Sequence, residues 1–242
     1  MQNLINRIFS AKIIFFDWDN TIANSFDAIH HSLHQTFIKM GRVPLTRGDL
    51  LSNKYGIHRS LRCSFPEIFG DNWEEARQHY YSEFSKCHLE QITLIKNAES
   101  FIQKLYNNGV LLFVISNKSS GYLHKEVEHF ALDKYFKCIV GSGDATKDKP
   151  DTAMIEYALQ KYYNSKSNNG SESEGKMLIT AEEKQAVFFI GDSIIDMETA
   201  LKFGCHPIKF GNGICDKALN NLKQKYCHQQ EIAHIEKYCD YI

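Results

Sequence analysis

Residues 12–21 of the chain carry the sequence KIIFFDWDNT. The apolar half of this segment, Ile13 to Phe16, is short and rich in Ile and Phe, which is typical of a strand buried on both faces of a parallel sheet. Asp17 ends the apolar run at once, and three polar residues, Asp19 to Thr21, follow Trp18. The segment therefore predicts a strand that delivers carboxylates to its carboxyl end.

Four more apolar runs predict further strands of the same sheet. Helical patterns lie between them, such as the i, i+3, i+4 spacing that begins at Ala98 and stops at Gly109. Pro150 suits the first turn of a helix over residues 151–162. Alternating strands and helices indicate an α/β fold with a Rossmann-like, mostly parallel sheet. The predicted strands are 110–115, 136–140, 186–190 and, with a weaker pattern, 206–210.

The chain from about residue 25 to residue 93 interrupts this alternation. It has no convincing strand, and apolar stripes at helical spacing run over residues 26–37 and 73–84. We therefore expect a small α-helical domain at 25–93, inserted into an α/β core domain made of residues 1–24 and 94–242. Residues 164–176 are rich in Ser, Asn and Gly, which predicts a surface loop. The tail from residue 216, including 231–238, is expected to be helical.

Composition excludes several classes of protein. The 242 residues include 28 Lys and Arg against 29 Asp and Glu, so the chain lacks the basic excess of a dedicated nucleic-acid binder. No apolar run approaches the roughly 20 residues of a membrane-spanning helix, and none resembles a secretory signal. The 7 cysteines are scattered without a C-x-x-C pair, which indicates reduced thiols. We therefore expect a cytoplasmic protein with no nucleic-acid or membrane partner.

Chemistry is expected where the strands end, because ligands of open parallel sheets bind beyond the carboxyl ends of the strands. Asp17 and Asp19 are two residues apart, so their side chains point the same way in an extended chain. Two close carboxylates repel each other unless a cation or a shared proton relieves them, and Mg²⁺ prefers such oxygen ligands. A turn with two solvated aspartates is the alternative explanation. Polar residues associated with the other strand ends are Ser116, Asn117, Lys149, Asp192 and Asp196.

Four short motifs resemble those of the haloacid dehalogenase superfamily of phosphohydrolases, in the same order and in matching strand–helix contexts. Residues 15–25, FFDWDNTIANS, resemble the first motif, whose pattern is D-x-D-x-T. Ser116-Asn117 resembles the second motif, Asp148-Lys149-Pro150 the third, and residues 191–196, GDSIID, the fourth. The resemblance covers nearly the whole chain, because the helical insertion also sits where members of one subclass carry a cap. Phosphoglycolate-phosphatase-like members are the nearest match.

The resemblance implies a role for each of these positions. Asp17 would be the nucleophile that forms an aspartyl-phosphate, and Asp19 would be first the general acid and then the general base. Mg²⁺ would be held by Asp17, the main-chain carbonyl of Asp19 and Asp192, with Asp196 as a further ligand or as a support for the ligands. The substrate-binding residues would be Thr21, Ser116, Asn117 and Lys149.

Three positions depart from the pattern of the family. Trp18 stands where many members have a small or aliphatic residue, and we expect its side chain to point away from the site. Asn20 replaces a frequent glycine, but asparagine tolerates left-handed backbone better than other residues do. Asp148 directly precedes Lys149 and could pair with it, which leaves Lys147 as a competing candidate for the site lysine.

The sequence supports one leading function and two alternatives. A magnesium-dependent phosphatase that hydrolyses a small phosphomonoester such as phosphoglycolate is the leading hypothesis, and the presence of Asp19 favours it over dehalogenation. By the same resemblance Arg59 of the insertion would meet a substrate carboxylate, although a solvated basic helix face explains this residue equally well. The alternatives are a phosphosugar mutase and a non-catalytic module that binds phosphorylated metabolites. The substrate and the oligomeric state stay open.

Overall fold

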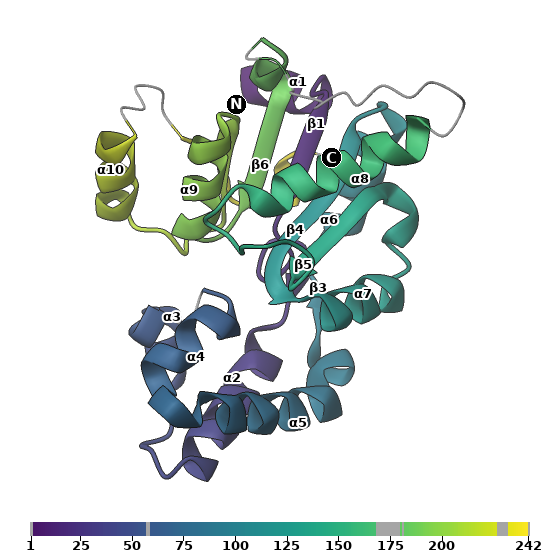
Figure 1. The fold of residues 1–242 in the computed structure, drawn as a ribbon. Coiled ribbons are helices and arrows are strands. Elements are labelled where there is room, and N and C mark those ends of the chain that lie inside the picture. The colour runs from purple at the N-terminus through teal and green to yellow at the C-terminus, as the bar shows by residue number, and fades with distance from the viewer. Residues whose placement is uncertain (1, 57–58, 168–179, 181, 227–231, 242) are drawn as a thin grey trace.

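The computed structural model describes residues 2–56, 59–167, 180, 182–226 and 232–241. A six-stranded sheet with the order β5-β4-β1-β6-β7-β8 lies at the centre of this part of the chain, and every neighbouring pair of strands is parallel (Figure 1). The strands are β1 (Ile13–Phe16), β4 (Leu111–Ser119), β5 (Phe136–Ser142), β6 (Val187–Gly191), β7 (His206–Phe210) and β8 (Ala233–Ile235).

Helices cover both faces of the sheet because alternate strand residues point to opposite sides. Ile14 and Phe16 of β1 pack with one set of helices, and Ile13 and Phe15 pack with another. All four residues are fully buried, which explains the unbroken apolar run. The first face carries α1 (Gln2–Phe9), α6 (Ala98–Asn107) and α7 (Ser120–His129), and the second carries α8 (Ala153–Ser167) and α9 (Ile194–Phe203).

The insertion forms a separate group of helices at one end of the sheet (Figure 1). Its apolar stripes meet in a core of their own, in which Leu33, Phe65, Phe84 and their neighbours are buried. The chain enters and leaves the insertion through a short antiparallel pair, β2 (Ala23–Asn24) and β3 (Thr93–Leu94). The helices are α2 (Phe26–Lys39), α3 (Arg47–Leu51), α4 (Leu61–Phe69) and α5 (Trp73–Gln91), with short 3₁₀ turns at Lys54–Gly56 and Gly70–Asn72.

The α/β fold and the helical insertion predicted from the sequence are confirmed, and three local predictions need correction. The helix after Pro150 begins at Ala153 because the Asp151 carboxylate lies before it and accepts a hydrogen bond from the Ala153 amide at 3.0 Å. The same helix extends to Ser167, so 164–167 are not loop, while 168–176 lie outside the described residues.

The tail is the third correction, because it is not wholly helical. After α10 (Asp216–Lys225) it adds β8 beside β7, followed by a 3₁₀ turn at Tyr238–Tyr241. A three-residue edge strand has too few residues to show a period in the sequence, and its pairing with β7 decides its conformation.

Among the described residues, no helix combines the length and the apolar character needed to cross a membrane.

Candidate active site

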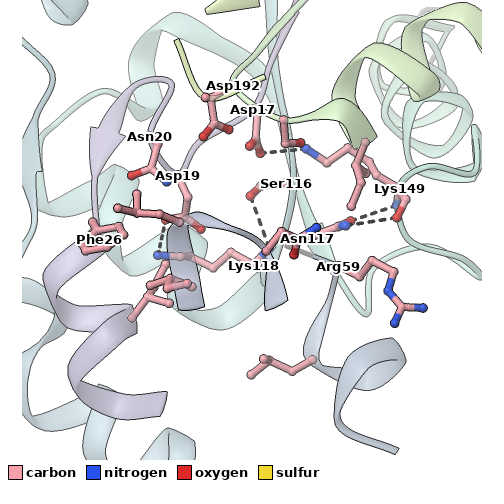
Figure 2. Close-up of a pocket in the computed structure, with 18 of the residues that line it drawn as sticks. Asp17, Asp19, Asn20, Phe26, Arg59, Ser116, Asn117, Lys118, Lys149 and Asp192 are labelled. Carbon is pink, nitrogen blue, oxygen red and sulfur yellow. Dashed lines mark hydrogen bonds and ion pairs between the residues drawn. The ribbon is translucent and has the colours of Figure 1, made fainter. Parts of the chain in front are cut away.

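A cavity of about 340 Å³ lies between the carboxyl ends of the strands and the helices of the insertion. Its floor comes from the segments that follow β1, from the end of β4 and from the segment after β6, and its walls come largely from α2, α3 and α5. Figure 2 shows Asp17 and Asp192 side by side on this floor, with Lys149 reaching Asp17 from another part of the chain. The topology thus brings three separate motifs of the sequence to one place.

The turn after β1 explains how Asp17 and Asp19 both face the cavity. The carbonyl of Trp18 accepts hydrogen bonds from the backbone amides of Ile22 and Ala23 at 2.9 and 3.0 Å, which closes a tight loop. Asn20 has φ 56° within it, the left-handed conformation that asparagine tolerates. Trp18 is fully buried and is absent from the cavity wall, so its side chain points away from the site as expected.

Three carboxylates and one ammonium group form the centre of the site. Oxygens of Asp17, Asp192 and Asp196 lie within 4.8 Å of one another. The Lys149 Nζ donates to Asp17 Oδ1 at 2.8 Å and to Asp196 Oδ1 at 2.6 Å. Gly191 leaves room for the Asp196 side chain, because a Cβ on residue 191 would lie 2.4 Å from it.

Burial and mutual repulsion dominate the electrostatics of this cluster. Burial, together with the charge of Asp196, raises the pKa of Asp17 to about 7 despite the opposing effect of Lys149. Burial and the charges of Asp17 and Asp196 likewise raise the pKa of Asp192 well above its ordinary value. For Lys149 burial acts to lower the pKa, but the two carboxylates outweigh it and the pKa is raised. One lysine therefore does not offset the cost of ionising all three carboxylates, and Asp17 and Asp192 hold their protons to a higher pH than free aspartates do.

The donor set fits a hard divalent cation. Oxygens of the three carboxylates lie within 4.8 Å of one another, and the pKa values of Asp17 and Asp192 are raised. A bound cation would reduce the repulsion between these carboxylates. Carboxylate oxygens are the ligands that Mg²⁺ prefers, and no softer Cys or His ligand belongs to the cluster. Lys149 already occupies one oxygen of Asp17 and one of Asp196, which leaves Asp192 the most available of the three.

Ser116 and Asn117 lie in the carboxyl-terminal half of β4, where Asn117 contacts the backbone of Lys149. Ser116 is buried, lines the cavity, and its Oγ accepts a hydrogen bond from the Lys118 amide at 3.3 Å. The Asn117 side chain instead bonds both backbone groups of Lys149: its Oδ1 accepts from the amide at 2.9 Å and its Nδ2 donates to the carbonyl at 3.1 Å. Asn117 thus fixes the segment that carries the lysine.

Lys149, rather than Lys147, is the lysine that the fold brings to the aspartates. Lys147 has a side chain that is 71% exposed and pairs with Asp151 on the surface. Asp148 does not pair with Lys149; its carboxylate accepts from Arg62 of α4 at 2.5 and 2.6 Å and from Ser142 at 2.9 Å. The ion pair between Arg62 and Asp148 joins the insertion to the core beside the site.

Two of the predicted site residues lie apart from the aspartates. Thr21 is fully buried and absent from the cavity wall, and its carbonyl accepts a hydrogen bond from the Tyr238 hydroxyl at 2.8 Å. Arg59 does line the cavity, but its guanidinium makes two hydrogen bonds to the Glu67 carboxylate and points away from the aspartates (Figure 2). The structure therefore gives neither side chain a contact at the centre of the site.

A buried network behind Asp19 escaped the sequence analysis. Lys118 Nζ contacts Asp19 Oδ1 at 2.7 Å and also the Glu126 oxygens at 2.7 and 2.9 Å. The Glu126 carboxylate, fully buried in α7, also accepts from Trp18 Nε1 at 2.8 Å and contacts His88 Nδ1 of α5 at 3.0 Å. The network thus connects the site, the core and the insertion.

The charges within this network stabilise one another. Burial by itself raises the pKa of Glu126, but Lys118 and the other donors outweigh it and the pKa is lowered. Burial likewise acts to lower the pKa of Lys118, while Asp19 and Glu126 act the other way and the pKa is raised. The ammonium group of Lys118 therefore stays charged beside Asp19.

The sequence profile of haloacid dehalogenase-like hydrolases matches residues 14–210. The chain belongs to this family. The hydrolase is 27% identical over 186 residues to pyrophosphatase PpaX of Listeria monocytogenes serotype 4b (strain CLIP80459), covering 76% of each chain. It is 24% identical to the phosphoglycolate phosphatase of Vibrio cholerae, over 94% of this chain and 91% of the relative.

A solved structure agrees with the fold of the hydrolase. A haloacid dehalogenase-like family protein from Streptococcus pneumoniae superposes with a TM-score of 0.70 at 20% identity, over 93% of this chain and 94% of that one. At this identity the likeness concerns the fold, and the site must be argued from its own residues.

Proposed function

We propose that this hydrolase is a magnesium-dependent phosphatase that cleaves a small phosphomonoester through an aspartyl-phosphate on Asp17. The observation that carries the proposal is the contact of Lys149 Nζ with Asp17 Oδ1 at 2.8 Å, beside two further carboxylates, on the floor of a cavity open to a ligand. An anionic nucleophile, a fixed cation and a set of hard oxygen ligands are what phosphoryl transfer needs.

In the proposed first step a carboxylate oxygen of Asp17 attacks phosphorus, and the bond from phosphorus to the leaving oxygen breaks. Asp19, also on the cavity wall, donates its proton to that leaving oxygen. In the second step Asp19 takes a proton from water, the water oxygen attacks phosphorus, and Asp17 is released with inorganic phosphate. Lys149 and Ser116 hold the phosphoryl oxygens, and Asn117 holds Lys149 in place.

Asp17, Asp192 and Asp196 would hold Mg²⁺ together with the main-chain carbonyl of Asp19. The bound ion supplies positive charge against the phosphoryl oxygens. With the ion bound, Asp17 would stay ionised at neutral pH, although its pKa of about 7 in the metal-free protein leaves it only partly ionised there.

The helices of residues 25–93 act in this proposal as a cap domain over a core of 1–24 and 94–242. The cavity between them suits a small phosphorylated metabolite. Phosphoglycolate is the first candidate from the resemblance, and one matched relative carries the name phosphoglycolate phosphatase. Arg59 would serve a carboxylate of such a substrate only after it releases Glu67.

The test is release of inorganic phosphate from a panel of phosphomonoesters with and without Mg²⁺. We expect release that EDTA abolishes and that Asp17→Asn lowers by several orders of magnitude. Interconversion of phosphosugar isomers with little phosphate release would favour a mutase. Binding without any turnover would favour a non-catalytic module. Release that survives either EDTA or Asp17→Asn would contradict the proposed mechanism.

A further inference from the structure

The cavity has two chemically different ends. The floor carries the aspartates and Lys149, whereas most of the other side chains that line the cavity are apolar or aromatic. These come from the insertion and from the core alike. They include Phe26, Ile29, Leu51 and Tyr81 of the insertion, and Tyr122 and Ile194 of the core.

A pair of flat rings forms part of this wall. The rings of Tyr81 and Tyr122 stack with their centroids 5.1 Å apart and an interplanar angle of 8°, and the Tyr122 hydroxyl donates to the Tyr81 carbonyl at 3.3 Å. Tyr81 belongs to α5 and Tyr122 to α7, so the stack joins the insertion to the core. Aromatic side chains of this kind favour flat, apolar ligand groups beside them.

Every cation on the wall, among the described residues, already has a carboxylate partner. Lys149 pairs with Asp17 and Asp196, and Lys118 pairs with Asp19 and Glu126. Arg59 is matched by both oxygens of Glu67. A carboxylate on the leaving group of a substrate would therefore meet apolar walls, or would have to displace Glu67 from Arg59.

We infer that the substrates of this hydrolase are phosphomonoesters whose leaving group carries an uncharged ring, as in an aryl phosphate or a nucleoside 5′-monophosphate. The cavity of about 340 Å³ falls in the size range of ligand sites, about 300–1,000 Å³, and a two-carbon acid would leave most of it empty. The inference rests on the proposed function, because the phosphoryl group at the aspartates is what directs the leaving group toward the apolar end.

A binding experiment tests the ligand class independently of turnover. Asp17→Asn protein with Mg²⁺ is titrated calorimetrically with phenyl phosphate, with a nucleoside 5′-monophosphate and with phosphoglycolate; asparagine removes the charge that repels the phosphate. We expect at least one ring-bearing compound to bind about tenfold or more tightly than phosphoglycolate. The compound that binds best identifies the size of the leaving group. Equal or tighter binding of phosphoglycolate would overturn the inference.

Turnover by the unmodified protein separates this inference from the proposed function. A higher kcat/KM for the ring-bearing esters supports both. A higher kcat/KM for phosphoglycolate leaves the phosphatase proposal standing and overturns the substrate class. Preferential binding of ring-bearing phosphates with no hydrolysis of any ester supports the ligand class and overturns the phosphatase proposal.

A matched pair of variants locates the selectivity in the apolar wall. Leu51 lines the cavity with a residue exposure of 69%, so Leu51→Asn changes the wall with little risk to folding. We expect its ratio of kcat/KM for phenyl phosphate over phosphoglycolate to fall about threefold to tenfold, mainly through KM. Val43→Asn, at an exposed position of the insertion outside the cavity wall, is the control and should keep the ratio. An unchanged ratio in Leu51→Asn would count against the apolar wall as the selective element.

Discussion

Replacing Glu126 with leucine removes the carboxylate that Trp18, His88 and Lys118 share in the buried network behind Asp19. The Glu126 side chain is fully buried and receives a hydrogen bond from Trp18 Nε1 at 2.8 Å and two from Lys118 Nζ at 2.7 and 2.9 Å. In Glu126→Leu the indole N–H loses its acceptor, and the ammonium of Lys118 keeps only Asp19. The variant therefore leaves buried donors without partners in a place that water does not reach.

The expected cost follows from this burial. Breaking a buried ion pair by removing one partner costs about 3–5 kcal/mol of unfolding free energy, and full burial leaves no discount for screening by solvent. For a chain of this size that corresponds to a fall in Tm of about 6–20 °C. The loss is pH-dependent, because the pKa of Glu126 is lowered from 4.5 in the folded protein. Its contribution is complete above that pH and is lost as the pH falls through the folded value.

Thermal and urea denaturation followed by circular dichroism measure the effect. Glu128→Leu is the matched control, since Glu128 lies exposed on the same helix and its replacement should change stability by about 0.5 kcal/mol or less. The double variant Lys118→Met/Glu126→Leu should be more stable than the sum of the two single changes by about 1–3 kcal/mol. A loss below about 1 kcal/mol in Glu126→Leu, or simple additivity in the double variant, would refute the network.

Three further predictions concern the carboxylate cluster. With the pKa of Asp17 raised to about 7 in the metal-free protein, the folded state keeps a proton that the unfolded state loses from pH 3.8 upward, so stability falls as the pH rises through this window. Asp17→Asn should therefore be more stable than the unmodified protein by a few kcal/mol at about pH 8, and the difference should vanish below about pH 4 in denaturation curves with EDTA. Mg²⁺ at about 100 times its Kd should raise the unfolding free energy of the unmodified protein by about 2.7 kcal/mol. In Asp192→Asn the Tm should not change when Mg²⁺ is added, as expected if Asp192 is a ligand of the ion. Gly191→Ala places a Cβ 2.4 Å from the Asp196 side chain and should lower phosphate release about 100-fold; activity at the original level would show that this carboxylate tolerates displacement.

Much of the fold follows from local sequence. The apolar runs at β1, β4 and β6 are short and buried on both faces, so their length and composition identify them as strands of a parallel sheet. The runs at β5 and β7 are also predicted, although β5 lies at the edge of the sheet and exposes Lys137. The stripes of the insertion likewise meet in one core. Local sequence patterns do not show which distant segments pair. The three residues of β8 are extended because they pair with β7, and the sequence alone did not predict this strand.

The aspartates of the site stood out because each follows a strand, whereas the network behind them depends on a contact between separate elements. One signal was available. Glu126 falls on the apolar stripe of Leu123, Val127 and Phe130, where a charged residue indicates a buried partner. Assigning Lys118 as that partner requires the packing of α7 against β4, and assigning His88 requires the packing of α5 against the core. The pairing of Arg59 with Glu67 depended in the same way on the geometry of the insertion.

The aspartyl-phosphate on Asp17 is tested directly by locating the phosphoryl group on the protein during turnover. The protein is mixed with Mg²⁺ and a hydrolysed phosphomonoester, quenched rapidly in acid, digested and analysed by mass spectrometry. We predict a phosphoryl adduct on Asp17 that hydroxylamine removes, as expected for an acyl phosphate, and no such adduct in Asp17→Asn. Turnover without any adduct on Asp17, or an adduct on another residue, would contradict the account.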